Sequence, residues 1–336
     1  MASITSNEIH LASRPRGWPT AENFTLARVE VPPPSDGQVL VRNLFMSVDP
    51  YMRGRMNDVK SYVPPFQIGQ PLEGGAIGEV VESRADGIKA GQVVLSNRGW
   101  REHFVADARE LRVVDPGIKP LSLYLGALGM PGMTAWVGLK LAELKAGDRL
   151  FVSAAAGAVG SIAGQLAKLR GAFVVGSAGS PEKVRMLIGE FGFDAAFDYK
   201  AGDVRRQLAN AAPEGIDVYF DNVGGDHLEA ALWSMREQGR IIACGAISRY
   251  NDEAPLPGPR NLFLMVTRRL TMKGFIVLDW ARETPAFLKE VAPLVASGQV
   301  RTKETVVDGL ASAPQAFLDL LRGGKVGKMI VRLVPS

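Results

Sequence analysis

The pattern of apolar and polar positions changes character near residue 125 of the chain. Up to Val114, short runs of alternating apolar and polar residues stand between prolines and glycines, a pattern typical of β-strands joined by turns. The clearest runs cover residues 39–46, 76–82 and 92–95. Such a series of short strands predicts a small, partly closed β-barrel.

Beyond Ala127, strand-like apolar runs alternate with helical segments. We expect strands at residues 149–153, 173–176, 195–198, 216–221, 239–244 and 271–276. This alternation is typical of an α/β domain with a doubly wound parallel sheet, the Rossmann arrangement.

After Gly298 the chain returns to short β elements, at 305–308 and 329–334, on either side of a helix at 313–321. We therefore expect the tail to rejoin the first domain. The predicted organisation is a barrel domain of residues 1–125 and 300–336, with a Rossmann domain of residues 126–299 inserted into it.

Composition narrows the classes of protein that the chain can belong to. It has 336 residues, 46% hydrophobic and 22% charged, which is long enough for two globular domains. The net charge of +4 comes without the basic run that marks nucleic-acid binding, so it favours an anionic cofactor over a polymer. Cys244 is the one cysteine, which excludes an internal disulfide and is normal for a cytoplasmic protein.

Targeting and membrane segments are not expected. Residues 1–16 are polar and lack the apolar core of a signal peptide. No apolar run approaches the length that a membrane span needs.

Residues 151–168 predict a strand, a tight turn of small residues and a helix. Within them, residues 155–160 fit the dinucleotide fingerprint with alanine at the first glycine position. In such a turn, backbone amides and the positive end of the helix dipole bind a pyrophosphate, and Gly160 and Gly164 would let the helix pack closely on the sheet. Small-residue runs also occur in ordinary packed helices, but the flanking strands favour a nucleotide site.

The end of the next strand bears on the choice of cofactor. NAD sites usually carry an acidic residue there, whereas residues 177–180 are small and uncharged and Lys183 follows. A ribose 2′-phosphate favours this arrangement, so we expect NADP(H). Lys183 also fits a helix that Ser180 caps and Pro181 opens, and the two interpretations are compatible. Glu182 opposes the prediction unless its carboxylate points away.

Seven segments, spread in order over nearly the whole chain, carry a family resemblance: 46–54, 129–136, 154–161, 178–183, 219–225, 244–251 and 274–277. They resemble the zinc-free, NADPH-dependent alkenal/one oxidoreductases of the medium-chain dehydrogenase/reductase superfamily. That subfamily includes leukotriene/prostaglandin reductases, plant double-bond reductases and the bacterial curcumin reductase. The resemblance implies a GroES-like barrel domain, a Rossmann domain, a cytoplasmic homodimer and reduction of a carbon–carbon double bond.

A metal site is not expected. A catalytic zinc needs about three protein ligands, and the chain offers Cys244, His10, His103 and His227, which are far apart in sequence. Leu72 stands where zinc-type relatives have a histidine ligand, so we interpret the following Glu73 as a structural carboxylate. His103 is expected on a barrel strand and His227 at a helix start. No serine stands in a Gly-x-Ser-x-Gly turn, so no nucleophilic triad is indicated either.

Hydride transfer to an enone leaves an enolate oxygen to stabilise and an α-carbon to protonate, and a phenol suits both tasks. Tyr250 is the preferred candidate, because it follows a predicted sheet strand at the carboxyl edge, where ligands bind. Tyr51 and Tyr62 come from loops of the first domain and are further candidates. The alternative is that these tyrosines are packed, amphipathic loop residues.

By resemblance, residues 157–160 bind the pyrophosphate and Lys183 and Tyr199 the adenosine phosphate, while residues 244–250 and 275–277 flank the nicotinamide. The full set of expected cofactor contacts is Met130, Thr134, Gly157, Ala158, Val159, Gly160, Ser180, Lys183, Tyr199, Asn222, Cys244, Gly245, Ala246, Ile247, Ser248, Tyr250, Phe275, Ile276, Val277 and Lys325.

Two of these positions carry alternatives. Asn222, with Asp221, could instead be an ordinary strand-to-helix cap. Lys325 departs from the family, which commonly has asparagine in its Gly-x-Asn-x-Gly-Lys block, so its contact with a cofactor phosphate stays open.

The expected function is NADPH-dependent reduction of the double bond of small α,β-unsaturated ketones and aldehydes. Quinone reduction is the nearest alternative, because it uses the same hydride donor. A non-catalytic NADPH-binding protein is the alternative from another class. The sequence does not select the natural substrate.

Overall fold

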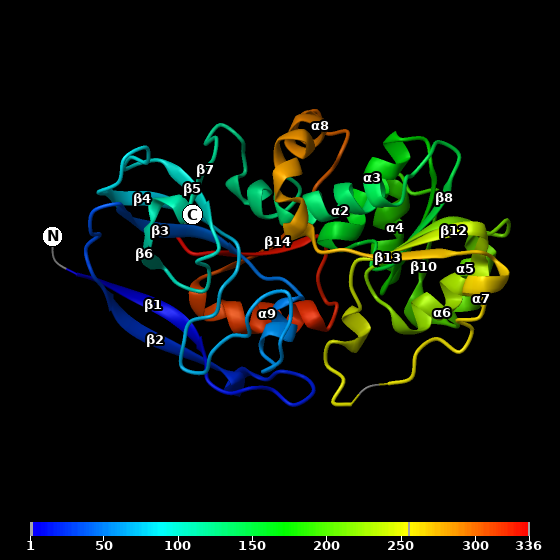
Figure 1. The fold of residues 1–336 in the computed structure, drawn as a ribbon, viewed down its shortest axis with the longest axis horizontal. Helices are drawn as coiled ribbons and strands as arrows, with labels where there is room; N and C mark the ends of the chain where they lie inside the picture. The colour runs from blue at the N-terminus through cyan, green and yellow to red at the C-terminus, as the bar shows by residue number, and fades with distance from the viewer. Residues whose placement is uncertain (1–2, 255, 335–336) are drawn as a thin grey trace. The chain divides into compact units, whose positions relative to one another are not determined.

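The computed structural model describes residues 3–254 and 256–334 and is shown in Figure 1. Two compact units divide the chain: the described residues up to Gly126 together with those from Glu304 onward, and Ala127–Lys303. Among the described residues, no helix combines the length and the apolar character that crossing a bilayer requires.

The first unit is built mainly of β-strands. A two-stranded antiparallel sheet pairs β1 (Ile4–Leu11) with β2 (Phe24–Val31). A seven-stranded sheet has the order β14-β15-β3-β4-β5-β7, with β6 also paired to β3. Its strands are β3 (Gln38–Ser47), β4 (Ala76–Ser83), β5 (Val93–Ser96), β6 (His103–Asp107), β7 (Arg112–Val113), β14 (Glu304–Asp308) and β15 (Lys328–Arg332). Since β14 and β7 end this order without pairing each other, the sheet is a partly closed barrel, as predicted.

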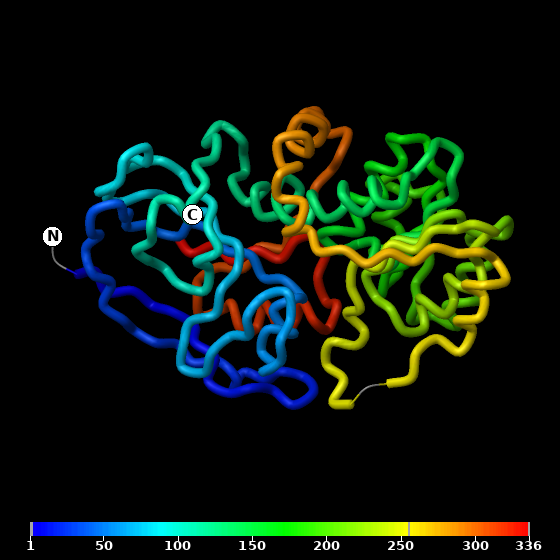
Figure 2. The backbone as a smooth tube through the Cα atoms, in the orientation of Figure 1, coloured from blue at the N-terminus to red at the C-terminus, as the bar shows by residue number. Residues whose placement is uncertain are grey.

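The C-terminal tail belongs to the first unit. β15 runs antiparallel to β3, with Ile330 opposite Ser47, and β14 runs parallel to β15. Figure 2 shows this red C-terminal strand beside the blue segment of β3. The helices of the unit are α1 (Met52–Arg55), α9 (Ala313–Leu321) and 3-10 turns at Ala21–Asn23, Ala108–Glu110, Leu121–Leu125 and Leu310–Ser312.

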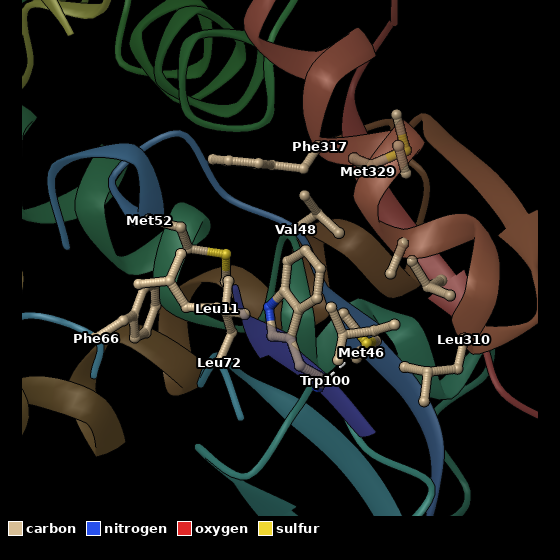
Figure 3. Close-up of a cluster of buried hydrophobic side chains, with 14 of the residues drawn as sticks. Leu11, Met46, Val48, Met52, Phe66, Leu72, Trp100, Leu310, Phe317 and Met329 are labelled. Carbon is tan, nitrogen blue, oxygen red and sulfur yellow. Dashed lines mark hydrogen bonds between the residues drawn. The ribbon is translucent and has the colours of Figure 1, made fainter. Parts of the chain in front are cut away.

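The core of the first unit gathers around Trp100, which is fully buried (Figure 3). Its indole stacks on Phe24 at 6.1 Å between ring centroids and meets Phe317 edge-on at 6.3 Å. Met52 points into the same cluster in Figure 3, as does Leu72. The core therefore joins the N-terminal strands to α9 of the tail, which explains why the two distant segments fold as one unit.

The second unit is a doubly wound sheet of parallel strands in the order β10-β9-β8-β11-β12-β13. The strands are β8 (Arg149–Val152), β9 (Phe173–Ala178), β10 (Ala195–Asp198), β11 (Ile216–Asp221), β12 (Met235–Ala243) and β13 (Thr271–Gly274). Its helices are α2 (Met130–Leu141), α3 (Ala158–Leu169), α4 (Pro181–Gly189), α5 (Val204–Ala211), α6 (Gly225–Ser234), α7 (Leu264–Thr267) and α8 (Thr284–Ala296), with 3-10 turns at Tyr199–Ala201, Ile247–Arg249 and Val277–Glu283. Figure 1 shows α2 and α3 on one side of this sheet and α5 and α6 on the other.

The predicted α/β fold is confirmed, and the differences lie at strand ends. Three strands expected to reach Ser153, Cys244 and Ile276 end earlier, because the chain leaves the sheet there to form loops at its carboxyl edge. Chain order reverses between β8 and β11: the chain runs outward through β9 and β10 and then returns to β11. Such a switch point is where open α/β sheets bind ligands.

Candidate functional site

The turn after β8 presents backbone amides at the switch point. Ala154 has a positive φ of 49°, which is uncommon for alanine and which the fingerprint did not indicate. The turn is held by Ala155 N–H, which donates to Ser177 O at 2.9 Å, and by Gly157 N–H, which donates to Ala154 O at 3.0 Å. Gly157 caps α3, whose first-turn N–H groups have no intrahelical partner and so form an anion-binding helix end.

The two glycines of α3 serve different contacts. A β-carbon on Gly160 would lie 2.5 Å from Ala154 O, so this glycine permits a close approach of the helix to the turn after β8. A β-carbon on Gly164 would lie 2.0 Å from the ring of Phe193. The expectation that Gly164 packs directly on the sheet was therefore wrong. Its space is filled by an aromatic side chain from the segment that leads into β10.

A cluster of polar and basic residues lies where β9 and β10 end. Ser180 caps α4 by accepting from Lys183 N–H at 3.4 Å, which confirms the predicted cap. Tyr199 packs its ring on Gly179, whose added β-carbon would come 3.0 Å from the phenol oxygen. Burial lowers the pKa of Lys183, and the nearby positive charge of Lys200 lowers it further.

Lys200 was not among the cofactor contacts expected from the sequence, although it directly follows Tyr199, which was included. Its ammonium lies 5.9 Å from the Tyr199 ring centroid. Two lysines whose charges repel each other form a site suited to a dianionic phosphate.

The carboxylate of Glu182 lies at the start of α4, beside Ser180. The residue is exposed, and its side chain pairs with Arg185 at 3.3 Å and bonds to Ser180. These contacts lower the pKa of Glu182, and its carboxylate is engaged within the first turn of α4.

A buried polar network holds the end of β11. Asp221 Oδ1 accepts from the Tyr219 hydroxyl at 2.7 Å and from the N–H groups of Val223 (2.9 Å) and Gly224 (2.7 Å). Burial raises the pKa of this carboxyl. Gly224 caps α6, so the interpretation of Asp221 and Asn222 as the helix cap itself was wrong. Asp221 instead organises the loop before the helix.

Asn222 connects this loop to the turn that follows β8 and to the segment that follows β12. Its N–H donates to Ser153 Oγ at 3.0 Å, and its amide donates to Ser153 O at 2.8 Å. Its carbonyl accepts from Ile247 N–H at 3.2 Å. Asn222 therefore lies between the predicted pyrophosphate turn and the segment that carries Tyr250.

Residues 244–250 turn back over the end of β11. The N–H groups of Cys244 and Gly245 both donate to Asp221 O, at 2.9 and 3.0 Å, and Ser248 Oγ donates to Val223 O at 2.6 Å. Ala246 caps the 3-10 turn that contains Ile247 and Ser248. The predicted nicotinamide segment is thus anchored by the same loop that Asp221 holds.

Tyr250 follows this turn and lies against its start. A β-carbon on Gly245 would come 3.1 Å from the Tyr250 hydroxyl oxygen and 3.4 Å from Asn222 O. The phenol therefore lies at the carboxyl ends of β11 and β12. Nearby, burial and the charge of Asp221 raise the pKa of the Cys244 thiol to about 12, so this sulfur is no nucleophile.

Seven further predicted contacts lie in the second unit. Phe275, Ile276 and Val277 follow β13, whose last residue pairs in register with the last residue of β12, so they leave the same sheet edge. Met130 starts α2, and Thr134 Oγ1 donates to Met130 O at 2.8 Å. Ala158 and Val159 form the first turn of α3 with Gly160.

Tyr51, Tyr62 and Lys325 belong to the first unit. Burial raises the pKa of Tyr51. The nearby Asp49 and Tyr62 raise this pKa further. Arg55 next to Tyr51 donates to Glu73 at 2.8 Å, so Glu73 is the structural carboxylate that the sequence predicted.

The lysine that departs from the family pattern has a partner within its own unit. Lys325 lies 3.5 Å from Asp319 of α9.

The histidines occupy separate structural positions. His103 begins β6 and His227 lies in the first turn of α6, as predicted, and His10 pairs with Glu8 at 2.8 Å. Among residues 3–254 and 256–334, no three His, Cys, Asp or Glu side chains gather as a metal site.

These positions fit a dinucleotide with a 2′-phosphate. Gly160 permits the tight turn before α3, whose amides can bind a pyrophosphate. Lys183 and Lys200 lie where β9 and β10 end, and the end of β9 itself carries no carboxylate.

Comparison with known proteins agrees with this geometry. Residues 7–114 match a family described as "N-terminal domain of oxidoreductase", and residues 158–293 match one described as "Zinc-binding dehydrogenase". The NADPH-dependent curcumin reductase of Escherichia coli is 42% identical, over 96% of this chain and 95% of that protein. The chain belongs to the medium-chain dehydrogenase/reductase family.

Two more members of the family are similar over nearly their full length. The 2-alkenal reductase (NADP(+)-dependent) of Nicotiana tabacum is 41% identical over 98% of this chain and 97% of its own. The crystal structure of CurA in complex with NADPH from Vibrio vulnificus is 39% identical, with a TM-score of 0.94, and covers 98% of this chain and 100% of its own.

Proposed function

We propose that this protein reduces the carbon–carbon double bond of α,β-unsaturated ketones and aldehydes with NADPH. The observation that carries the proposal is the Tyr250 phenol, which lies against Gly245 at the carboxyl edge of the parallel sheet. The similar curcumin and alkenal reductases support it, because they match nearly the whole length of the chain.

The second unit holds the cofactor in this proposal. The amides at the start of α3 bind the pyrophosphate, and Lys183, Lys200 and Tyr199 bind the 2′-phosphate. Residues 244–250, which the Asp221 network holds, and residues 275–277, which follow β13, flank the nicotinamide. When bound, NADPH supplies a hydride for the β-carbon of the substrate.

Tyr250 stabilises the charge that then develops on the carbonyl oxygen. Its hydroxyl donates a hydrogen bond to the enolate oxygen and relays a proton toward the α-carbon. The first unit contributes Tyr51 and Tyr62, which contact the substrate as further donors. Burial raises the pKa of Tyr51, so at neutral pH this phenol keeps its proton and can donate it.

The test measures NADPH oxidation over a panel of enals, enones and quinones, with product analysis. We expect a saturated ketone or aldehyde that retains its carbonyl group and carries deuterium from labelled NADPH at the β-carbon. An allylic alcohol would mean carbonyl reduction and would overturn the proposal. Turnover confined to quinones would replace it with quinone reduction, and no turnover at all would favour a binding protein.

A homodimer is part of the proposal. β13 is the last strand in the order of its sheet, and all four of its residues are exposed. Phe263 and Val266 nearby are 61% and 79% exposed. An exposed edge strand beside apolar side chains suits antiparallel pairing with the same strand of a second copy.

The remaining assignments follow from the same proposal. The two compact units are its domains, one for the cofactor and one for the substrate. The protein acts in the cytoplasm on a small molecule, without a metal and without a nucleic-acid partner.

A further inference from the structure

The first unit contains a buried ion pair that the proposed reaction does not use. Lys328 begins β15 and is 4% exposed, and its ammonium lies 3.0 Å from Asp49, which is 5% exposed. The ammonium also donates to Val48 O at 2.9 Å and to Met329 O at 3.0 Å, so all three of its protons have acceptors. The other carboxylate oxygen of Asp49 accepts from the Ser47 hydroxyl.

This pair lies beside the apolar core. Val48 and Met329 both belong to the cluster around Trp100 in Figure 3. A well-packed apolar pair at such a place is commonly as stable as an ion pair, because burying two charges removes them from water. The presence of the ion pair therefore points to a role in fixing geometry rather than in raising stability.

The geometry it fixes is the turn that carries Tyr51. Met52 N–H donates to Asp49 O at 3.2 Å, which closes the turn over Tyr51. On the far side, Met52 inserts into the core so tightly that a β-carbon on Gly74 would come 2.3 Å from its methyl group. Arg53 adds a third anchor through Gly17 O at 2.7 Å. Tyr51 is thus held between buried residues on both sides.

We propose that Lys328 and Asp49 are positioning residues for Tyr51: their ion pair ties β15 to the turn and sets where this phenol meets the substrate. The inference rests on the proposed function, in which Tyr51 contacts the substrate. It explains why residues 49–51 and Lys328, far apart in sequence, belong to one arrangement.

The experiment is a double-mutant cycle on the full-length protein. Asp49→Asn keeps the shape of the side chain but removes its charge. We expect enone kcat to fall by about tenfold to a hundredfold, the cost of a small misplacement in a reactive geometry, while the Kd for NADPH is unchanged. In a Tyr51→Phe background, the same substitution should cause no further loss of kcat. Asp308→Asn, which removes an exposed pair with Arg332 between β14 and β15, is the matched control and should leave kcat unchanged.

Each outcome decides the matter. A loss of kcat from Asp49→Asn that is equally large in the parent protein and in Tyr51→Phe would overturn the inference. It would leave the proposed reaction intact. An unchanged kcat in Tyr51→Phe alone would overturn the role of Tyr51 and the inference with it, while product analysis judges the reaction separately. If Asp49→Asn does not fold, the apolar double variant Asp49→Leu with Lys328→Met takes its place, and the same cycle with Tyr51→Phe applies.

Discussion

The hydroxyl oxygen of Tyr250 lies against Gly245, close enough that a β-carbon on the glycine would come within 3.1 Å of it. Because Gly245 is anchored to Asp221 O, this proximity places the phenol at the end of β12. We expect Tyr250→Phe to bind NADPH normally, as measured by fluorescence titration. Its enone kcat should fall by roughly a hundredfold to a thousandfold, the usual loss for one oxyanion donor.

Tyr124→Phe is the control for that substitution. Its hydroxyl donates to Asp115 O within the first unit, outside the candidate site, and its loss should leave kcat unchanged. Normal enone turnover by Tyr250→Phe would move the donor role to Tyr51 or Tyr62.

Lys183 and Lys200 should determine the preference for NADPH over NADH. A charge-assisted contact contributes about 1.5–3 kcal/mol, so Lys183→Ala should raise the KM for NADPH on the order of tenfold to a hundredfold. The KM for NADH should hardly change, because NADH lacks the 2′-phosphate. Lys200→Ala should act in the same direction, and Lys168→Ala, whose lysine pairs with Asp194, is the control. A parent enzyme that binds NADH as tightly as NADPH would contradict this assignment.

Gly160 and Gly164 should respond differently to alanine. At Gly160 the new methyl group meets backbone at 2.5 Å, so Gly160→Ala should distort the turn and weaken NADPH binding in a titration. At Gly164 it meets the Phe193 ring, so Gly164→Ala should lower stability by about 1–3 kcal/mol in urea unfolding, the usual cost of overpacking. Gly189→Ala has open space and should be harmless. Equal NADPH affinity in the Gly160 and Gly189 variants would show that the turn tolerates the methyl group.

His227 should make stability depend on pH. Burial lowers its pKa from 6.5 to about 4 in the folded protein, so the unfolded chain binds the proton first as the pH falls. The contribution of His227 to the free energy of unfolding is complete above about pH 6.5 and declines as the pH falls toward about 4. Near pH 5 the free energy of unfolding should be lower by about 2 kcal/mol. Urea unfolding at several pH values measures this. His227→Phe, which preserves the stacking on Phe151, should show a flatter profile, and parallel profiles would contradict the prediction.

The proposed dimer predicts that substitutions in the exposed apolar patch near β13 weaken self-association. Val266→Glu places a charge on an apolar side chain that is 79% exposed, so it should shift sedimentation toward the monomer. Ile188→Glu on α4 lies toward the opposite edge of the sheet, where β10 stands, and should leave association unchanged. A parent protein that sediments as a monomer would rule out the dimer.

Local sequence signals sufficed where neighbouring residues decide the conformation. The strands at Ala195–Asp198 and Ile216–Asp221 and the helix at Ala313–Leu321 were predicted with their bounds. Ser180 and Pro181 likewise predicted the start of α4. These elements could be predicted from the sequence because hydrophobic periodicity, helix capping and turn formation depend on a few neighbouring residues.

Contacts between distant segments could not be predicted in the same way. Phe193 fills the space over Gly164, and Lys200 lies near Lys183, yet nothing in their immediate sequence indicates either neighbour. The same is true of Asp221, which resembled a helix cap and instead holds the loop before it.

The amino-acid sequence by itself determined the order of elements, the strand–turn–helix at residues 151–168 and the small, uncharged end of β9, since these depend on local propensity and on the sizes and charges of adjacent residues. The tertiary structure alone decided that Lys328 meets Asp49 and that the Tyr250 phenol lies against Gly245. Which side chains touch depends on how strands pair and how loops pack, and these long-range choices are set by burial over the whole unit rather than by any short stretch of sequence.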